Sequence, residues 1–196
     1  SVLPNFVQEK YYHQDYFPST DQLLKIVSVG NLRKEKNHET LILAMQQLPD
    51  MELEIIGDGP ERTKLESLVT HAGISNVNFL GAVKNVPETI SRAHIFVMPS
   101  KFEGFGIALG EAMALGMPCI ASDIPVFKEL GKDSLIYFNP FELSSLVESI
   151  DLLRNADLRK AYGAKSREQA KEFNEESYIA KLKIIYTNLD CGYFGN

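Results

Sequence analysis

The sequence predicts an α/β fold: a Rossmann-like, doubly wound parallel sheet with helices on both faces and a helical extension at the C-terminal end. Short apolar runs alternate with helical segments between residues 24 and 138, and such alternation is typical of a parallel sheet covered by helices. Turns that contain Gly30, Gly57 and Gly104 each follow an apolar run. Because ligands of such sheets bind beyond the carboxyl ends of the strands, we expect these turns to converge on one site.

The expected strands are short apolar runs bounded by glycine, proline or polar residues. The first ends at Gly30, and the run before the most informative motif ends at Pro99. Runs that are apolar throughout indicate strands buried on both faces. In chain order the expected strands are Leu24–Val29, Met51–Ile56, Val77–Leu80, His94–Met98, Cys119–Ala121 and Leu135–Phe138.

The expected helices are marked by a 3.6-residue apolar period and by start and stop residues. Asn37 is expected to cap the first, whose apolar residues are Leu41, Leu43, Ala44 and Leu48. Pro60 is expected at the first position of the second, which runs to about Ala72 and stops at Gly73. Further helices are expected at 87–92, before Gly116, and near Glu142–Arg154, Asp157–Phe173 and Glu176–Leu189, and the last three carry no recognised site chemistry.

Composition limits the classes of protein that the chain can represent. Its 196 residues suffice for one domain with a full core, and 44% apolar and 23% charged residues are ordinary for a soluble globular protein. The net charge of −6 argues against a nucleic-acid binder, which usually needs a basic face. No apolar run approaches the ~18 residues that indicate a membrane span, and no secretory signal pattern opens the chain.

Cysteine and histidine show no metal-binding pattern. Cys119 lies in an expected buried strand, so we interpret it as a small core residue. With Cys191 it makes only two cysteines, which fits a reducing cytosol. The histidines are scattered, and His94 at a strand start is interpreted as a core or edge residue. We therefore expect a cytoplasmic protein without a metal site.

The most informative stretch runs from Glu103 to Glu111, Glu-Gly-Phe-Gly-Ile-Ala-Leu-Gly-Glu. It places a carboxylate at each end of a glycine-rich turn that leads from a strand into a helix. Backbone N–H groups and the positive end of a helix dipole at such a turn suit a phosphate or a sugar oxygen. Gly104 and Gly106 let a ligand approach the backbone. We place Glu103 in the turn and Glu111 about two turns along the helix.

The spacing of the two glutamates favours a grip on an extended ligand over acid–base cleavage. At ~1.5 Å rise per helical residue the two backbones could be ~12 Å apart, whereas the carboxyls of a glycosidase pair lie within ~5–10 Å of each other. A nucleotide sugar has hydroxyls at both ends and a diphosphate between them. Side chains can close part of the gap, so the spacing expresses a preference between two open interpretations.

With its flanks, this stretch resembles the signature of the retaining glycosyltransferases of the GT-B fold, in family four, also named glycosyl transferases group 1. Further segments are similar to the same family, in the same order along the chain. These segments are Gly30–Asn37, Leu53–Glu61, Val77–Gly81, Phe96–Ser100 and Glu111–Pro118. The similarity covers roughly residues 3–190 and implies the second, donor-binding half of that fold.

The resemblance implies a role for each site residue. Glu111 would hold the ribose hydroxyls, Glu103 would contact the transferred sugar, and Lys36 would neutralise the leaving diphosphate, so Glu103 and Lys36 are the candidate catalytic residues. Val83, in the loop Leu80–Lys84, would flank the base. The other candidate donor-binding residues are Gly30, Asn31, Arg33, Gly57, Gly59, Gly104, Phe105, Gly106, Ile107 and Ala108. No cofactor or metal is implied besides the donor substrate, a nucleotide-diphosphate sugar such as a UDP- or GDP-sugar.

Position 31 departs from the family pattern, which usually has arginine directly after Gly30. Asn31 removes one charge-assisted contact, worth ~1.5–3 kcal/mol if fully made. Arg33 is a candidate substitute, in a basic cluster with Lys34 and Lys36. The departure bears on diphosphate affinity more than on the fold.

The resemblance covers one of the two Rossmann-like halves that the family uses. We interpret 1–22 as an interdomain linker and leading segment, in which Leu3-Pro-Asn-Phe6 is similar to the family's linker, 23–173 as the donor-binding domain, and 174–196 as a C-terminal helix and tail. The missing N-terminal domain is the expected partner, so the chain alone is expected to bind nucleotide weakly and to transfer nothing. The side chains expected to be partly exposed and to favour self-association are Tyr178, Ile184, Ile185 and Tyr186.

The family's commonest bacterial setting is polysaccharide or lipopolysaccharide assembly at the inner face of a membrane, so peripheral membrane association of the full enzyme is expected. A non-catalytic nucleotide-sugar-binding or regulatory domain of the same fold stays open because of Asn31. A dinucleotide-dependent oxidoreductase would need Gly-x-Gly-x-x-Gly, and the Gly30 loop lacks the second and third glycines. A nucleotide-sugar epimerase would usually show different histidine and acidic motifs.

Overall fold

The computed structural model describes residues 5–18 and 23–193, with side chains described as far as residue 187. Six parallel strands form one sheet in the order β3-β2-β1-β4-β5-β6. The predicted α/β class and the doubly wound parallel sheet are therefore confirmed. The strands are β1 (Leu24–Val29), β2 (Met51–Ile56), β3 (Val77–Gly81), β4 (Ile95–Met98), β5 (Cys119–Ser122) and β6 (Ile136–Phe138).

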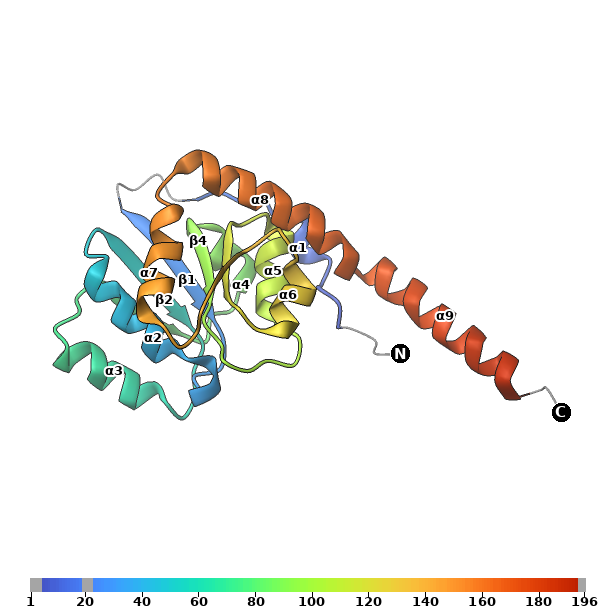
Figure 1. Ribbon diagram of the computed structural model, residues 1–196, viewed down its shortest axis with the longest axis horizontal. Coiled ribbons are helices and arrows are strands. Elements are labelled where there is room, and N and C mark those ends of the chain that lie inside the picture. Colours follow the sequence, from blue (N-terminus) through green and yellow to red (C-terminus); the bar gives the residue numbers. More distant parts are fainter. Residues whose placement is uncertain (1–4, 19–22, 194–196) are drawn as a thin grey trace.

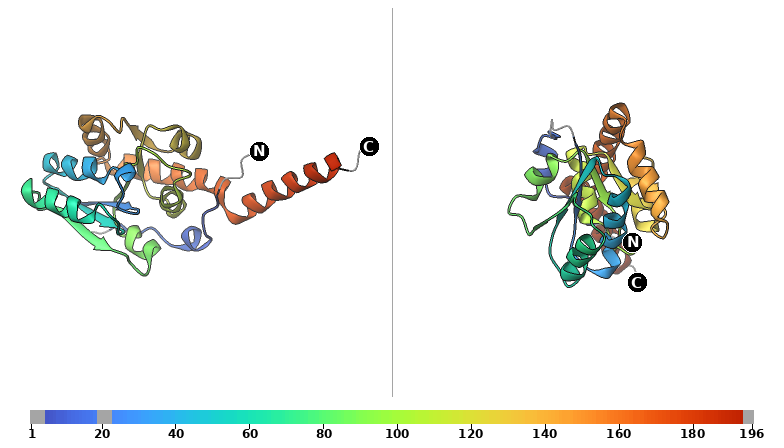
Figure 2. Two further views of the ribbon diagram at one scale, coloured as in Figure 1. Left: turned by 90° about the horizontal axis from the view of Figure 1, so that it is seen from below. Right: turned by 90° about the vertical axis from the view of Figure 1, so that its left-hand side faces the viewer.

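Helices cover both faces of the sheet (Figures 1 and 2). One face packs against α2 (His38–Ala44), α3 (Arg62–His71) and α7 (Leu143–Leu152). The other packs against α1 (Lys10–His13), α4 (Val86–Ser91), α5 (Ile107–Leu115), α6 (Pro125–Gly131) and α8 (Ala156–Ala170). Every residue of β4 and β5 is buried because both faces of the central sheet are covered.

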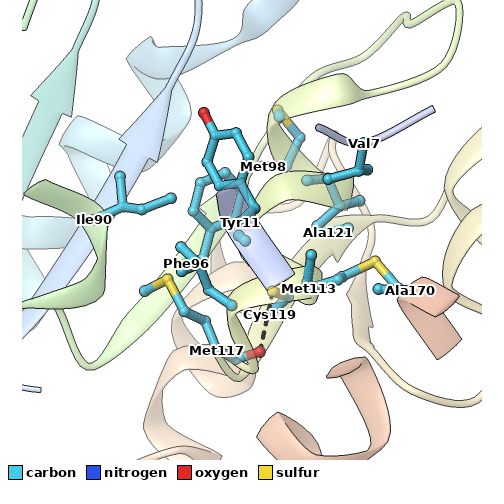
Figure 3. Packing of buried hydrophobic residues seen from close by; sticks show 14 of the residues in the cluster. Val7, Tyr11, Ile90, Phe96, Met98, Met113, Met117, Cys119, Ala121 and Ala170 are labelled. Carbon is cyan, nitrogen blue, oxygen red and sulfur yellow. Dashed lines mark hydrogen bonds between the residues drawn. The ribbon is translucent and has the colours of Figure 1, made fainter. Parts of the chain in front are cut away.

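The core on the α5 side contains the predicted small cysteine (Figure 3). Cys119 is fully buried in β5, and its thiol donates a hydrogen bond to the carbonyl of Met117 at 3.3 Å. Phe96 of β4 and Met113 of α5 pack in the same cluster. Cys119 thus serves as a core residue, as its position in the apolar run indicated. The side chain of Cys191 and residues Leu3 and Pro4 lie outside the described residues.

One predicted helix start is confirmed without its side-chain bond, and another is wrong. Asn37 occupies the N-cap position of α2, as predicted, but its side chain makes no capping hydrogen bond. It adopts a left-handed backbone with φ of 56° and is buried among three loops. Pro60 lies in a turn, and α3 begins at Arg62 with Glu61 at its N-cap.

Two short helices, α1 and α6, are absent from the sequence-based expectation because neither has room for two turns of apolar periodicity. Their burial is nonetheless substantial, since Tyr11 of α1 and Phe127 of α6 are each at most 2% exposed. Backbone bonds connect the leading segment to the end of the core, with Val7 N–H donating to the carbonyl of Phe173 at 2.8 Å. The Tyr12 hydroxyl likewise donates to the carbonyl of Ala170 at 2.7 Å.

The predicted C-terminal helices are present as α7, α8 and α9 (Glu175–Tyr193). Figure 1 shows α9 projecting away from the body of the molecule. Ile184 and Tyr186 are 61% and 63% exposed, and Tyr178 and Ile185 are half-buried. The expected exposure of these four side chains is confirmed, and self-association through them stays a prediction.

His94 has the structural role that the sequence indicated. It is buried before β4, and its Nδ1 accepts a hydrogen bond from the backbone N–H of Lys25 at 2.9 Å. The His94 carbonyl accepts a hydrogen bond from the Tyr16 hydroxyl at 3.0 Å. The imidazole thus joins the start of β4 to the start of β1.

Candidate functional site

A cavity of about 840 Å³ opens where the strand order reverses, beyond the carboxyl ends of β1 and β4. This is the topological switch point at which open α/β sheets bind their ligands. Eight of the predicted site residues line the cavity: Gly30, Lys36, Glu103, Gly104, Phe105, Gly106, Ile107 and Ala108. The sequence therefore located the main wall of the site.

Backbone and side-chain bonds hold the loop after β1 against the loop after β4. The N–H of Lys101 donates to the carbonyl of Glu35 at 2.8 Å. The Asn37 amide Nδ2 donates to the carbonyls of Pro99 at 3.1 Å and Pro140 at 3.4 Å, and Oδ1 accepts from the Thr40 hydroxyl at 2.8 Å. These contacts bring residues 36 and 103 together although they are far apart in the sequence.

Lys36 and Glu103, the two candidate catalytic residues, form an ion pair between Nζ and Oε1. Their side chains are 21% and 12% exposed, so the pair is partly shielded from water. The buried hydroxyl of Ser100 also donates to Oε1 of Glu103, at 3.3 Å. One carboxylate oxygen therefore has two donors, from two different loops.

The turn from Glu103 into α5 presents unused backbone donors to the cavity. Gly106 occupies the N-cap position with a left-handed φ of 87°. In the part of the chain that the structure describes, the N–H groups of residues 104–108 donate to no backbone carbonyl. Donors at a helix N-terminus favour a phosphate or another oxygen anion, so the turn has the chemistry that the sequence predicted.

Glu111 lies apart from the other candidates. It is the fifth residue of α5, little more than one turn from the helix start, because the helix begins at Ile107 and not earlier. It does not line the main cavity. Burial raises the pKa of the Glu111 carboxyl, and a hydrogen bond from the Tyr11 hydroxyl and the charge of Lys10 oppose this rise. Glu111, the residue predicted to bind the ribose, is thus partly covered by α1.

Comparison with known proteins identifies the family. The model of the family described as glycosyl transferases group 1 matches residues 14–169. The chain belongs to the group 1 glycosyltransferases. A curated relative, N-acetyl-alpha-D-glucosaminyl L-malate synthase of Bacillus anthracis, is 28% identical over 198 residues, which cover 93% of this chain and 52% of that protein. The chain therefore spans about half the length of this relative.

Solved structures share the fold of this chain. Sucrose-phosphate synthase from Thermosynechococcus elongatus superposes with a TM-score of 0.84 at 25% identity, covering 98% of this chain and 53% of that one. HepE from Anabaena, solved in complex with UDP and glucose, gives a TM-score of 0.77 at 21% identity, with 86% and 48% covered. Both resemblances extend over nearly the whole described fold.

The remaining predicted donor-binding residues lie outside the main cavity. Gly57 and Gly59 pack against the loop after β1: an added Cβ at Gly59 would approach the Asn31 side-chain oxygen to 2.3 Å. Arg33 faces a separate cavity of about 190 Å³ with His38 and Lys34. Val83 packs partly buried against the core. The contacts of these residues with a donor stay predictions. Gly57 and Gly59 are explained by loop packing, because a side chain at either position would clash with the loop after β1.

The C-terminal segments of the glycosyltransferase contribute to the cavity, which sequence reasoning did not indicate. Phe173 forms an edge-to-face pair with Phe105, at a ring separation of 5.7 Å. Lys132 Nζ binds both carboxyl oxygens of Glu172, at 2.6 and 2.7 Å. No local motif marks these residues, because they come from the residue after α6 and from the short helical turn after α8, and only the fold brings these segments beside the cavity. The lining residues missed are Asn5, Val29, Met98, Val126, Glu129, Leu130, Lys132, Glu172, Phe173 and Lys181.

Alanine substitutions at Gly104 and Gly106 are expected to have different effects, the first on ligand binding and the second on stability. A Cβ at Gly104 would have no protein atom within 4 Å, whereas one at Gly106 would meet the Phe127 ring at 2.7 Å on a left-handed backbone. We expect the free energy of unfolding of Gly104→Ala to lie within about 0.5 kcal/mol of the wild-type value. The same variant should bind nucleotide sugar at least about tenfold more weakly. Gly106→Ala should lose about 2–3 kcal/mol of stability.

Urea denaturation and titration calorimetry of both variants would check this expectation. Unchanged affinity in Gly104→Ala would mean that the ligand does not approach the turn at residue 104. Equal stabilities of the two variants would contradict the steric argument for Gly106.

His38 makes the stability of this domain sensitive to acid. Its Nδ1 is buried without a hydrogen-bond partner, and burial, aided by the charge of Lys36, lowers the pKa of the imidazole from 6.5 to about 4. Between these pH values the unfolded chain binds the proton and the folded chain does not. We therefore expect the free energy of unfolding to fall on acidification through this window, by up to about 1.4 kcal/mol per pH unit from this group.

Urea denaturation of the wild type and of His38→Gln at several pH values between 7 and 4 would isolate this contribution, because other titrating groups are common to both proteins. The variant should lose less stability on acidification. Parallel pH profiles would show that His38 does not titrate differently in the folded and unfolded states.

No group of three or more His, Cys, Asp or Glu side chains in the described residues could hold a metal ion. Over the same residues, no helix has both the length and the apolarity to cross a bilayer.

Proposed function

We propose that this chain is the donor-binding domain of a glycosyltransferase that moves a sugar from a nucleotide-diphosphate sugar to an acceptor with retention of configuration. One observation carries the proposal: Lys36, Glu103 and the unused N–H donors of residues 104–108 face one cavity at the switch point. A cation, a carboxylate and helix N-terminal donors are the groups that a sugar diphosphate needs.

The proposed roles follow from the chemistry of each group. The N–H groups of 104–108 and Lys36 hold phosphate oxygens, and Lys36 offsets the negative charge that builds on the leaving diphosphate. Stabilisation of developing charge by fixed groups is usually the largest catalytic contribution. Glu103 accepts hydrogen bonds from hydroxyls of the transferred sugar. Glu111 accepts those of the ribose once α1 allows access to it.

The whole enzyme is proposed to work with an N-terminal acceptor domain, so the chain alone binds donor and transfers nothing. The family membership and the coverage of about half of the curated relative support this proposal. A UDP-sugar is the first donor to test, because HepE was solved with UDP and glucose. Polysaccharide or lipopolysaccharide assembly, with the full enzyme peripherally at a membrane, is the setting that the resemblance favours.

The decisive experiment is titration calorimetry of the chain with UDP, GDP and ADP, alongside Glu111→Gln and the exposed-surface control Glu176→Gln. One nucleotide should bind, and Glu111→Gln should weaken it at least about tenfold, or about 1.4 kcal/mol. The control should bind like the wild type. Binding of no nucleotide, by this chain or by the two-domain protein, would overturn the proposal.

A further inference from the structure

The Lys36–Glu103 pair occupies the cavity wall before any donor arrives. Both side chains are largely shielded from water, and their backbones are held by the Lys101–Glu35 and Asn37–Pro99 bonds. Such clamping keeps the two charges adjacent with little conformational freedom. Because Lys36 already donates to Glu103, a phosphate that approaches this ammonium group meets the carboxylate beside it and competes with that carboxylate for the charge of Lys36.

The loss of the Lys36 contact affects Glu103 differently when the ligand is a nucleotide-diphosphate sugar and when it is a free nucleoside diphosphate. When Lys36 moves its hydrogen bonds to a phosphate, Glu103 keeps only the Ser100 hydroxyl as a donor in the described structure. A shielded carboxylate that loses its cation is strongly destabilised unless new donors replace it. The hydroxyls of a transferred sugar are such donors, whereas a free nucleoside diphosphate carries none at that end.

We propose that the Lys36–Glu103 pair selects nucleotide-diphosphate sugars over free nucleoside diphosphates. The pair exchanges partners: phosphate takes Lys36 while sugar hydroxyls take Glu103. A free diphosphate takes Lys36 and leaves Glu103 underpartnered, so it binds weakly and leaves readily. This inference rests on the proposed function and assigns to the pair a discrimination that neither residue has alone.

The test compares affinities for UDP and UDP-glucose, or for the base that binds first with its matching sugar conjugate, in the 196-residue chain. Glu103→Gln removes the competing charge, so affinity for the free diphosphate should rise about fivefold or more, while affinity for the sugar conjugate should fall. Lys36→Met should weaken both ligands. Ser100→Ala removes the remaining donor of Glu103, so it should weaken the free diphosphate more than the sugar conjugate.

Thermal unfolding of each variant establishes that it is folded before titration. Weaker or unchanged binding of the free diphosphate by Glu103→Gln would overturn the inference, and so would equal effects of Ser100→Ala on the two ligands. If the wild type binds nucleotide in a Lys36-dependent manner but Glu103→Gln fails as described, only this inference is lost. If the wild type binds neither ligand, the proposed function is lost with it.

Discussion

Gly57→Ala is expected to destabilise the fold by at least about 3 kcal/mol, because strain and a backbone clash add at this position. Gly57 follows β2 with a φ of 131°, which L side chains rarely adopt. An added Cβ would lie 2.0 Å from the carbonyl oxygen of Gly30 and 2.9 Å from its carbonyl carbon. Neither atom is at the end of a flexible side chain, so the loops after β1 and β2 must separate.

The chain provides a matched control in Gly73, whose φ is 64° and whose added Cβ would meet nothing within 4 Å. Gly73→Ala isolates backbone strain and should cost about 1–2 kcal/mol. Urea denaturation of the two variants measures the difference, which combines the clash with the Gly30 loop and the greater backbone strain at a φ of 131°. Equal losses would show that the loop moves without resistance.

Asn37→Ala is expected to lose about 3–5 kcal/mol of stability, from two buried carbonyls left without their donor and from a left-handed backbone. The Asn37 amide donates to Pro99 and Pro140, so its removal releases the loop that carries Lys36 from the loop that leads to Glu103. Nucleotide affinity should fall with stability. Calorimetric titration at a temperature where the variant is folded separates the two effects.

Asn37→Gly is the matched variant, because glycine adopts φ of 56° without strain but offers no amide. We expect a loss of about 2–3 kcal/mol, smaller than for alanine by the backbone contribution. If the glycine variant were as stable as the wild type, the two side-chain hydrogen bonds would make no net contribution.

The sequence predicts the sheet well because each strand is a run rich in apolar residues that lies between clear turns. The segment from β4 into α5 is the best example, since a fully apolar strand, a glycine turn and an apolar helix follow one another within a few residues. Its carboxylate and its N–H donors lie in the cavity as expected. Local chemistry and tertiary position agree there.

Other features depend on contacts between distant segments, which a single sequence does not display. Asn37 is a residue type that often caps helices, yet its side-chain oxygen accepts from the Thr40 hydroxyl and its amide Nδ2 donates to the carbonyls of Pro99 and Pro140. Gly57 resembles a ligand-facing glycine, yet the Gly30 loop occupies the space beside it. Phe173, in the short helical turn after α8, lines the cavity only because the fold packs its ring against Phe105, which is far away in the sequence.

The main-chain bond from Lys101 to Glu35 has a consequence for how this site can be altered. A bond between an N–H and a carbonyl needs no particular side chain at either position. Both side chains are exposed, so residues 35 and 101 can be substituted while the main-chain bond keeps the two loops in the same relative position. Lys101 lines the separate cavity beside Arg33, so substitutions at these two positions would change the charge there while the backbone bond between the two loops is kept.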